Sequence, residues 1–216
     1  MKKLNIIYED KELLVISKPS GILTIASAKE KTRTIYHEAR EYIKKQNPHN
    51  KIYIVHRLDK DTSGVILFAK NEKLKEKFQE NWSNIAIERT YIAIVEKTPS
   101  KKKDRLINYL QESSTHQVYV TKDQKNGKLA ITNYEVLKTN GKMSLLKINI
   151  ETGRKNQIRS QLQYIGNPII GDKKYQAKTN PIKRLGLHAH VLKIIHPITA
   201  KEMTFEAPIP KSFNII

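Results

Sequence analysis

Strand-like segments dominate this chain, and helical segments do not alternate regularly with them. Apolar patterning predicts strands over residues 5–8, 13–17, 65–69, 85–96, 130–137, 145–150 and, with a turn near residues 197–201, over residues 191–205. Helical spacing is confined to residues 34–45, to Leu74, Phe78 and Trp82 after an N-cap at Asn71, and to Ile158, Leu162 and Ile165 before a capping Gly166. Because a doubly wound parallel sheet needs regular alternation, this order favours an α+β fold with a mixed, mostly antiparallel sheet and flanking helices.

The length of 216 residues predicts a single domain over residues 1–216. The sequence contains no internal repeat or low-complexity tract, and the longest linker-like stretch is the basic segment 97–105. The absence of cysteine excludes disulfides, thiolate catalysis, zinc knuckles and iron–sulfur clusters. The first residues lack the apolar core of a signal peptide, and the apolar runs 65–69 and 91–95 fall far short of the roughly 20 residues of a membrane span. We therefore expect a soluble, cytoplasmic protein.

The net charge indicates the class of partner. Lysine and arginine total 40 against 21 acidic residues, which gives a formal charge of +19. A surface this positive favours a polyanion, of which nucleic acid is the commonest, although a generally lysine-rich composition would give the same total. The basic run 97–105 is open to both interpretations, as RNA-contacting residues or as a solvated loop.

The densest concentration of reactive side chains lies between His56 and Gly64. Nine residues offer two carboxylates, two cations, a histidine and two hydroxyls directly before the apolar run 65–69. A polar loop feeding a buried strand is a typical arrangement for holding reactive groups on a rigid scaffold. Alternatively, the segment is a structural turn in which Asp59 pairs with Lys60 and the following polar side chains bond to their own backbone. The residue chemistry alone leaves both interpretations open.

The pattern His56-Arg57-Leu58-Asp59-x-x-Thr62-Ser63-Gly64 resembles the signature of the RluA-type pseudouridine synthases. Further family blocks are similar to residues 13–21, 89–95, 127–137, 151–159, 165–172 and 187–189, so the resemblance covers essentially residues 5–210. The resemblance implies an RNA pseudouridine synthase, an isomerase that acts on ribosomal or transfer RNA without cofactor or metal. It also implies the family's catalytic domain, in a short form without an N-terminal S4-like domain, and we expect a monomer.

The resemblance implies that Asp59 is the catalytic nucleophile, that Tyr91 is the active-site tyrosine and that Arg159 pairs with Asp59. A nearby cation keeps a carboxylate ionised in a pocket where desolvation would raise its pKa. An aromatic ring can receive a base that has been flipped out of the RNA, and by family analogy the Tyr91 hydroxyl helps to move a sugar proton. The residues expected to bind RNA are Lys18, His56, Arg57, Arg89 and Arg154.

The chain departs from the family pattern at two positions. Where members usually have histidines within and after the block Gly153–Arg159, this chain has Asn156 and Gln161. Both replacements keep a hydrogen-bonding side chain and lose a titratable ring, which concerns substrate positioning and therefore the choice of RNA. They also favour an alternative, a non-catalytic RNA-binding paralogue, whereas the joint retention of Asp59, Tyr91 and Arg159 opposes it. An RNA-binding structural protein of ribosomal type would explain the charge but not the loop chemistry.

Three histidines are candidate metal ligands. His188 and His190 are two residues apart on an expected strand and share a face, with His196 nearby in sequence. No cysteine or close carboxylate completes a ligand set, so we expect no metal.

Overall fold

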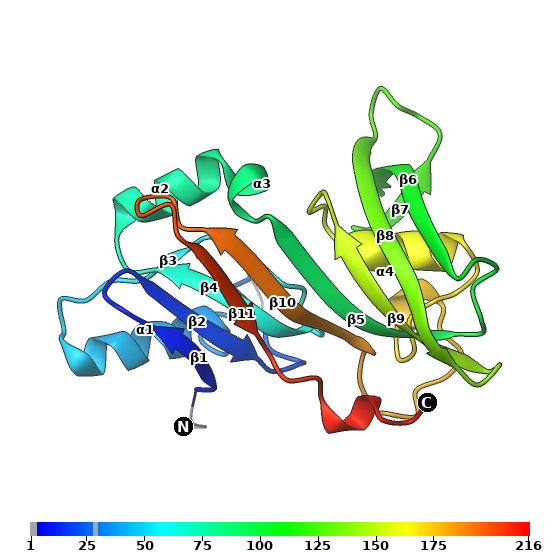
Figure 1. The fold of residues 1–216 in the computed structure, drawn as a ribbon, viewed down its shortest axis with the longest axis horizontal. Coiled ribbons are helices and arrows are strands. Elements are labelled where there is room, and N and C mark those ends of the chain that lie inside the picture. Colours follow the sequence, from blue (N-terminus) through cyan, green and yellow to red (C-terminus); the bar gives the residue numbers. More distant parts are fainter. Residues whose placement is uncertain (1–3, 28–29) are drawn as a thin grey trace. The chain divides into compact units, whose positions relative to one another are not determined.

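The computed structural model describes residues 4–27 and 30–216, which form two compact units (Figure 1). The first unit comprises the chain up to Glu88 together with Ala189–Pro208, and the second comprises Arg89–His188 and Ile209–Ile216. Neither unit is a continuous segment. The assignment of residues 1–216 to a single domain stays a prediction, because division into compact units does not test which part folds independently.

The first unit combines strands with three helices among its described residues. Its elements are β1 (Ile6–Glu9), β2 (Leu13–Lys18), α1 (Ile35–Gln46), β3 (Tyr53–Ile54), β4 (Ser63–Ala69), α2 (Glu72–Glu80), α3 (Trp82–Ile85), most of β10 (Leu187–Ile195) and β11 (Glu202–Glu206). The strands are hydrogen-bonded in the order β1-β2-β4-β10-β11, and β3 also pairs with β4. Strand β2 runs antiparallel to β1 and β4, and β10 runs antiparallel to β11.

Strand β4 is buried over its whole length, as the apolar run 65–69 predicts. One face, with Val65 and Leu67, packs in the cluster that also holds Leu74 and Phe78 of α2. On α1, the ring of Tyr36 lies 6.4 Å from the ring of Phe68 in β4. Because side chains of alternate residues point to opposite faces of a strand, a strand with both faces covered reads as an unbroken apolar run.

The second unit has a continuous antiparallel order of strands. Its elements are β5 (Glu88–Glu96), β6 (Lys103–Glu112), β7 (Val118–Thr121), β8 (Lys128–Thr139), β9 (Met143–Ile150), α4 (Gln157–Tyr164) and the short 3-10 helices η1 (Lys173–Tyr175) and η2 (Lys211–Phe213). The strand order is β5-β9-β8-β6-β7, and every neighbouring pair is antiparallel. Helix α4 lies against β6, β7 and β8 (Figure 1). The expected α+β class is therefore confirmed.

The local end signals of the helices are confirmed. The side chain of Asn71 accepts a hydrogen bond from the Leu74 N–H at 2.8 Å and so caps α2. Gly166 follows α4 with φ +84°, the left-handed backbone that a glycine accepts without strain. Trp82 was predicted to continue the α2 face, but α2 ends at Glu80 and Trp82 begins the separate helix α3.

The observed strands differ from the sequence prediction in several places. Strand β5 begins at Glu88, not at residue 85, because Trp82–Ile85 is helical. Strands β6 and β7 were not predicted, and β6 begins inside the basic segment 97–105. Strand β6 leaves several residues exposed or half-buried, including Ile107 at 52% exposure, so its sequence lacks a strong apolar alternation.

Gly64 occupies a position where a side chain meets backbone. It is the second residue of β4, just after the Asp59 loop, and has φ +116°. A Cβ at this position would lie 2.0 Å from the carbonyl oxygen of Ala189, in the same unit. The close approach of two backbones, rather than the turn alone, requires glycine here.

We expect Gly64→Ala to destabilise the protein by at least about 3 kcal/mol, since the clash involves backbone atoms that cannot rotate away. Urea unfolding measures the loss. Gly141→Ala is the matched control, because Gly141 also has positive φ (+82°) but has no atom within 4 Å of the added Cβ. The control should lose only about 1–2 kcal/mol. Equal losses in the two variants would contradict the role of the Ala189 contact.

Candidate functional site

Asp59 lies in the loop between β3 and β4 and is half-buried. The Thr62 N–H donates to the Asp59 carbonyl at 3.2 Å, which closes a turn within the loop. The neighbouring Leu58 is fixed through its backbone. The hydroxyl of the buried Thr24 donates to the Leu58 carbonyl at 2.7 Å and accepts from the Leu58 N–H at 3.2 Å. The segment is thus a structural turn, and its hydrogen bonds fix the backbone that carries the Asp59 carboxylate.

Lys18 attaches the first turn of the chain to the Asp59 loop. Its side chain is fully buried, and its ammonium group donates to the carbonyls of Pro19, Ile22 and Lys60 at 3.0, 2.8 and 2.9 Å. Beside it, the Gly21 N–H also donates to the Lys60 carbonyl at 3.0 Å. That Lys18 contacts RNA stays a prediction. Its side chain has no exposed surface, and its hydrogen bond to the Lys60 carbonyl fixes the Asp59 loop.

His56 and Arg57, the two residues at the start of the motif, have different surroundings. The His56 ring stacks on Trp82 with ring centroids 4.8 Å apart, and its Nε2 accepts from the Leu67 N–H at 3.0 Å. This bond places a lone pair on Nε2 and fixes the ring against β4. Arg57 is exposed. His56 therefore supports the loop through the ring, whereas Arg57 is accessible from solvent.

Arg89 and Tyr91 project from β5 of the second unit. Tyr91 packs partly against that unit's core. Arg89 is only 9% exposed, its Nη2 donates to the Glu151 carbonyl at 2.6 Å, and its buried Nε has no hydrogen-bond partner. Burial lowers the pKa of Arg89. A buried guanidinium held by a carbonyl alone is only partly compensated, so it favours an anion.

The side chain of Glu151, whose carbonyl accepts from Arg89, is bound to other residues. The Glu151 carboxylate accepts from Arg105 at 2.9 and 2.8 Å and from Asn133 at 2.9 Å. These hydrogen bonds, first of all those from Arg105, lower the pKa of Glu151 to about 2. Arg89 consequently makes no ion pair with a carboxylate in the described part of the chain, which distinguishes it from Arg105.

Arg159 ends the Gly153–Arg159 block, lies in the first turn of α4 and is buried, with 8% exposure. Its Nε and Nη2 donate to the two carboxylate oxygens of Asp172 at 2.7 and 2.8 Å. Its Nη1 donates to the Asn156 side-chain oxygen at 3.0 Å. Its guanidinium carbon also lies 5.0 Å from the ring centroid of Tyr175. Sequence reasoning missed the role of Asp172, although the residue lies in a quoted family block; an acidic residue directly after Gly171 was the available signal.

The two family departures have different structural roles. Gln161 is fully buried and donates to the Leu106 and Ala130 carbonyls at 3.3 and 3.2 Å, so it joins α4 to β6 and β8 and does not face solvent. Asn156 precedes α4 with φ 51° and contacts Arg159. The change at Gln161 therefore concerns packing, whereas the change at Asn156 concerns the arginine.

Arg154 is exposed, and its Nε donates to the Leu129 carbonyl at 2.9 Å.

Among the described residues, no group of three or more acidic or histidine side chains could hold a metal ion. Within the same residues, no helix is long and apolar enough to cross a membrane.

Comparison with known proteins identifies the family. Residues 12–164 match the model of the RNA pseudouridylate synthase family. The chain belongs to this family. It is 33% identical over 210 residues to the uncharacterized RNA pseudouridine synthase YhcT of Bacillus subtilis, covering 96% of this chain and 69% of that protein. It is 31% identical over 224 residues to ribosomal large subunit pseudouridine synthase D of Escherichia coli, covering 96% and 68%.

The fold agrees with this membership. The structure of human RNA pseudouridylate synthase domain containing 4 matches with a TM-score of 0.80 at 23% identity, covering 97% of this chain and 90% of that one. The RluA-type resemblance and the isomerase class are confirmed. The chain is an RNA pseudouridine synthase, and the non-catalytic alternative is not favoured.

We expect Lys18→Met to destabilise this pseudouridine synthase by at least about 2 kcal/mol, because three carbonyls lose the hydrogen bonds of a buried donor. It should also lower kcat, since the Asp59 loop loses an anchor. Thermal unfolding and uridine isomerisation measure the two effects. Lys70→Met is the matched control: Lys70 is also largely buried in the first unit, but it donates to Glu9 and to the Asp10 carbonyl. A control that lost kcat equally would contradict a specific role for Lys18.

Proposed function

We propose that Asp59 is the nucleophile with which this pseudouridine synthase isomerises uridine in RNA. The reaction breaks the bond between ribose C1′ and uracil N1 and forms a bond between C1′ and uracil C5. The C5 proton is lost and a proton is taken up at N1, so the product is an isomer and no oxidant or cofactor is consumed. A carboxylate can attack covalently in such a reaction. The match of the loop to the family signature, in a chain shown to belong to the family, carries the proposal.

Arg159 and Tyr91 are proposed to serve the same nucleotide. A guanidinium next to Asp59 would keep its carboxylate ionised despite desolvation, and Arg159 is the candidate. The Tyr91 ring would receive the flipped base, for which stacking on an aromatic side chain contributes about 1–3 kcal/mol. Its hydroxyl would assist transfer of a sugar proton.

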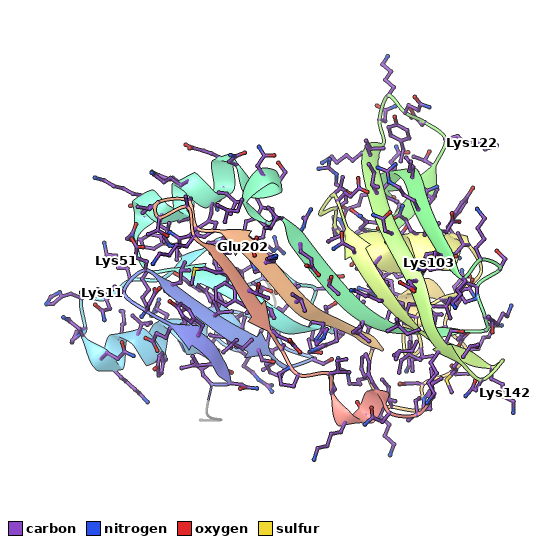
Figure 2. The ribbon with its side chains drawn as sticks, in the orientation of Figure 1. Lys11, Lys51, Lys103, Lys122, Lys142 and Glu202 are labelled. Atoms are coloured by element: carbon purple, nitrogen blue, oxygen red, sulfur yellow. The ribbon has the colours of Figure 1, made fainter. Side chains whose placement is uncertain are left out.

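Arg57, Arg89, Arg154 and His56 are proposed to contact the RNA. The exposure of Arg57 and Arg154 supports phosphate contacts, and the incompletely compensated charge of Arg89 supports an interaction with an anion. His56 would contact only RNA groups that approach its ring closely, since the ring is fixed by Trp82 and by the Leu67 N–H of β4. The surrounding surface adds general attraction: Lys11, Lys51, Lys103, Lys122 and Lys142 are exposed side chains on the two units (Figure 2).

The substrate is proposed to be ribosomal RNA, with transfer RNA as the alternative. Relatives from Escherichia coli and Rickettsia bellii bear the name ribosomal large subunit pseudouridine synthase. The strong positive charge fits a large folded RNA. We further propose that the enzyme acts in the cytoplasm as a monomer.

Asp59→Asn should abolish activity, by at least about 10³-fold, because an amide is no nucleophile at this carbon. Tritium release from RNA labelled at uracil C5 measures turnover, and a filter-binding assay should show RNA affinity largely unchanged. Asp61→Asn is the matched control, since Asp61 is an exposed carboxylate two residues away in the same loop. Substantial tritium release by Asp59→Asn would rule out the proposed nucleophile.

Arg57→Ala should weaken RNA binding or base flipping while the melting temperature stays at the wild-type value. If Arg57 binds a phosphate, the slope of log K against log salt should fall by about one unit. Arg40→Ala controls for loss of one exposed arginine, because Arg40 lies on α1 and pairs with Glu41. Identical binding, salt dependence and kcat for Arg57→Ala and the wild type would remove Arg57 from the RNA-binding set.

A further inference from the structure

The guanidinium of Arg159 is held from three sides within the second unit. Asp172 receives two parallel hydrogen bonds, at 2.7 and 2.8 Å, on one edge of the group. Asn156 receives a third hydrogen bond, at 3.0 Å, from the other terminal nitrogen. The Tyr175 ring covers one face at 5.0 Å. A planar group bonded on two edges and covered on a face has one orientation, whereas a lysine ammonium at the same place would rotate.

Asp172 is itself fixed. Its side chain is 1% exposed, and its Oδ1 also accepts from the Tyr175 N–H at 3.3 Å. Its backbone N–H donates to the Ile169 carbonyl at 3.1 Å, and its carbonyl accepts from the Ala177 N–H at 3.0 Å. The carboxylate therefore cannot follow a displaced arginine, and it defines where the guanidinium lies.

Asn156 supplies its contact through an unusual backbone. It stands at the start of α4 with φ 51°, and its side chain makes no capping bond to the helix. The left-handed conformation is tolerated best by glycine and asparagine. The side-chain oxygen accepts from Arg159 instead of capping the helix, and so provides a second contact that fixes the guanidinium.

We propose that Asp172 and Asn156 are positioning residues for pseudouridine formation, which orient the guanidinium of Arg159 for its interaction with Asp59. This inference rests on the proposed roles of Asp59 and Arg159. The proposal assigns neither residue a contact with the substrate. Their effect passes through the arginine, and a misplacement of about 1 Å at such a group is enough to lower a rate about 10²-fold.

Asp172 could affect the rate through its charge or through the orientation that it gives Arg159, and the two predict opposite effects of replacing it. Its negative charge opposes the field that Arg159 exerts on another carboxylate, so removing the charge alone would stabilise an ionised Asp59 and maintain the rate. Loss of the fixed orientation of the Arg159 guanidinium, in contrast, would lower the rate. Asp172→Asn separates the two, because the amide oxygen can still accept from the Tyr175 N–H while the amide nitrogen faces the Arg159 donor.

The experiment compares full-length variants in the tritium-release assay, with RNA labelled at uracil C5. Asp172→Asn should lower kcat about 10- to 100-fold with KM for RNA within about twofold of wild type. Asn156→Gly keeps the left-handed backbone and removes only the side-chain acceptor, so it should fold normally and lower kcat about three- to tenfold.

Two comparisons exclude a merely structural role. Glu96→Gln is the matched control, because Glu96 is a buried carboxylate in the same unit that accepts from Lys178 and Thr179 and makes no contact with Arg159. It should lower stability and leave kcat within about twofold. In an Arg159→Lys background, Asp172→Asn should lower kcat less than about threefold further, since coupled residues are not additive.

Three outcomes overturn the proposal: wild-type kcat for Asp172→Asn, additive effects of Asp172→Asn and Arg159→Lys, or wild-type kcat for Asn156→Gly. Should Asp172→Asn fail to fold, Asn156→Gly decides alone. The variant Arg159→Ala distinguishes a failure of the positioning proposal from a failure of the proposed role of Arg159 itself. If Arg159→Ala is active, the proposed role of Arg159 is contradicted. If Arg159→Ala is inactive while Asp172→Asn is fully active, only the positioning role of Asp172 is contradicted.

Discussion

The buried ammonium of Lys18 is the interaction on which the Asp59 loop depends. Burying a charge is unfavourable unless hydrogen bonds replace its hydration. Here carbonyls from two segments, Pro19 and Ile22 on one side and Lys60 on the other, surround the ammonium group. Lys18 and Lys60 are 42 residues apart, so the lysine ties a local turn to a distant loop. A reactive carboxylate can be placed accurately on a loop only if the backbone that carries it is fixed in this manner.

The second unit buries two arginines by different means, and the difference matches their proposed roles. Arg159 is compensated by the Asp172 carboxylate, which fixes its orientation. Among the described residues, Arg89 donates a hydrogen bond to the Glu151 carbonyl and pairs with no carboxylate, while the Glu151 carboxylate is occupied by Arg105. A fully paired guanidinium is a rigid part of the protein, and an incompletely paired one retains attraction for an incoming anion. The same side chain can thus position a catalytic group or attract RNA, according to its neighbours.

Local sequence signals predicted the elements whose causes are local. The cap at Asn71, the glycine after α4 and the buried run of β4 each follow from side chains within a few residues, and all are confirmed. Strand β6 was missed because its residues pair with β7 and β8 while much of one face remains exposed. The burial of Lys18 was not predicted, because a lysine in a polar turn gives no sign of burial. Its burial depends on a loop that lies far away in the sequence.

The sequence by itself determined the family, the α+β class and the residues for which a catalytic role is proposed, since a nine-residue signature and strand-like patterning are readable along the chain. Only the tertiary structure decided which polar side chains are buried and what they bind. Lys18 became an anchor for the loop, Gln161 a packing residue, and Asp172 and Asn156 the partners of Arg159. The physical reason is that desolvation and hydrogen-bond geometry arise from groups brought together across the fold, and no linear pattern records those distances.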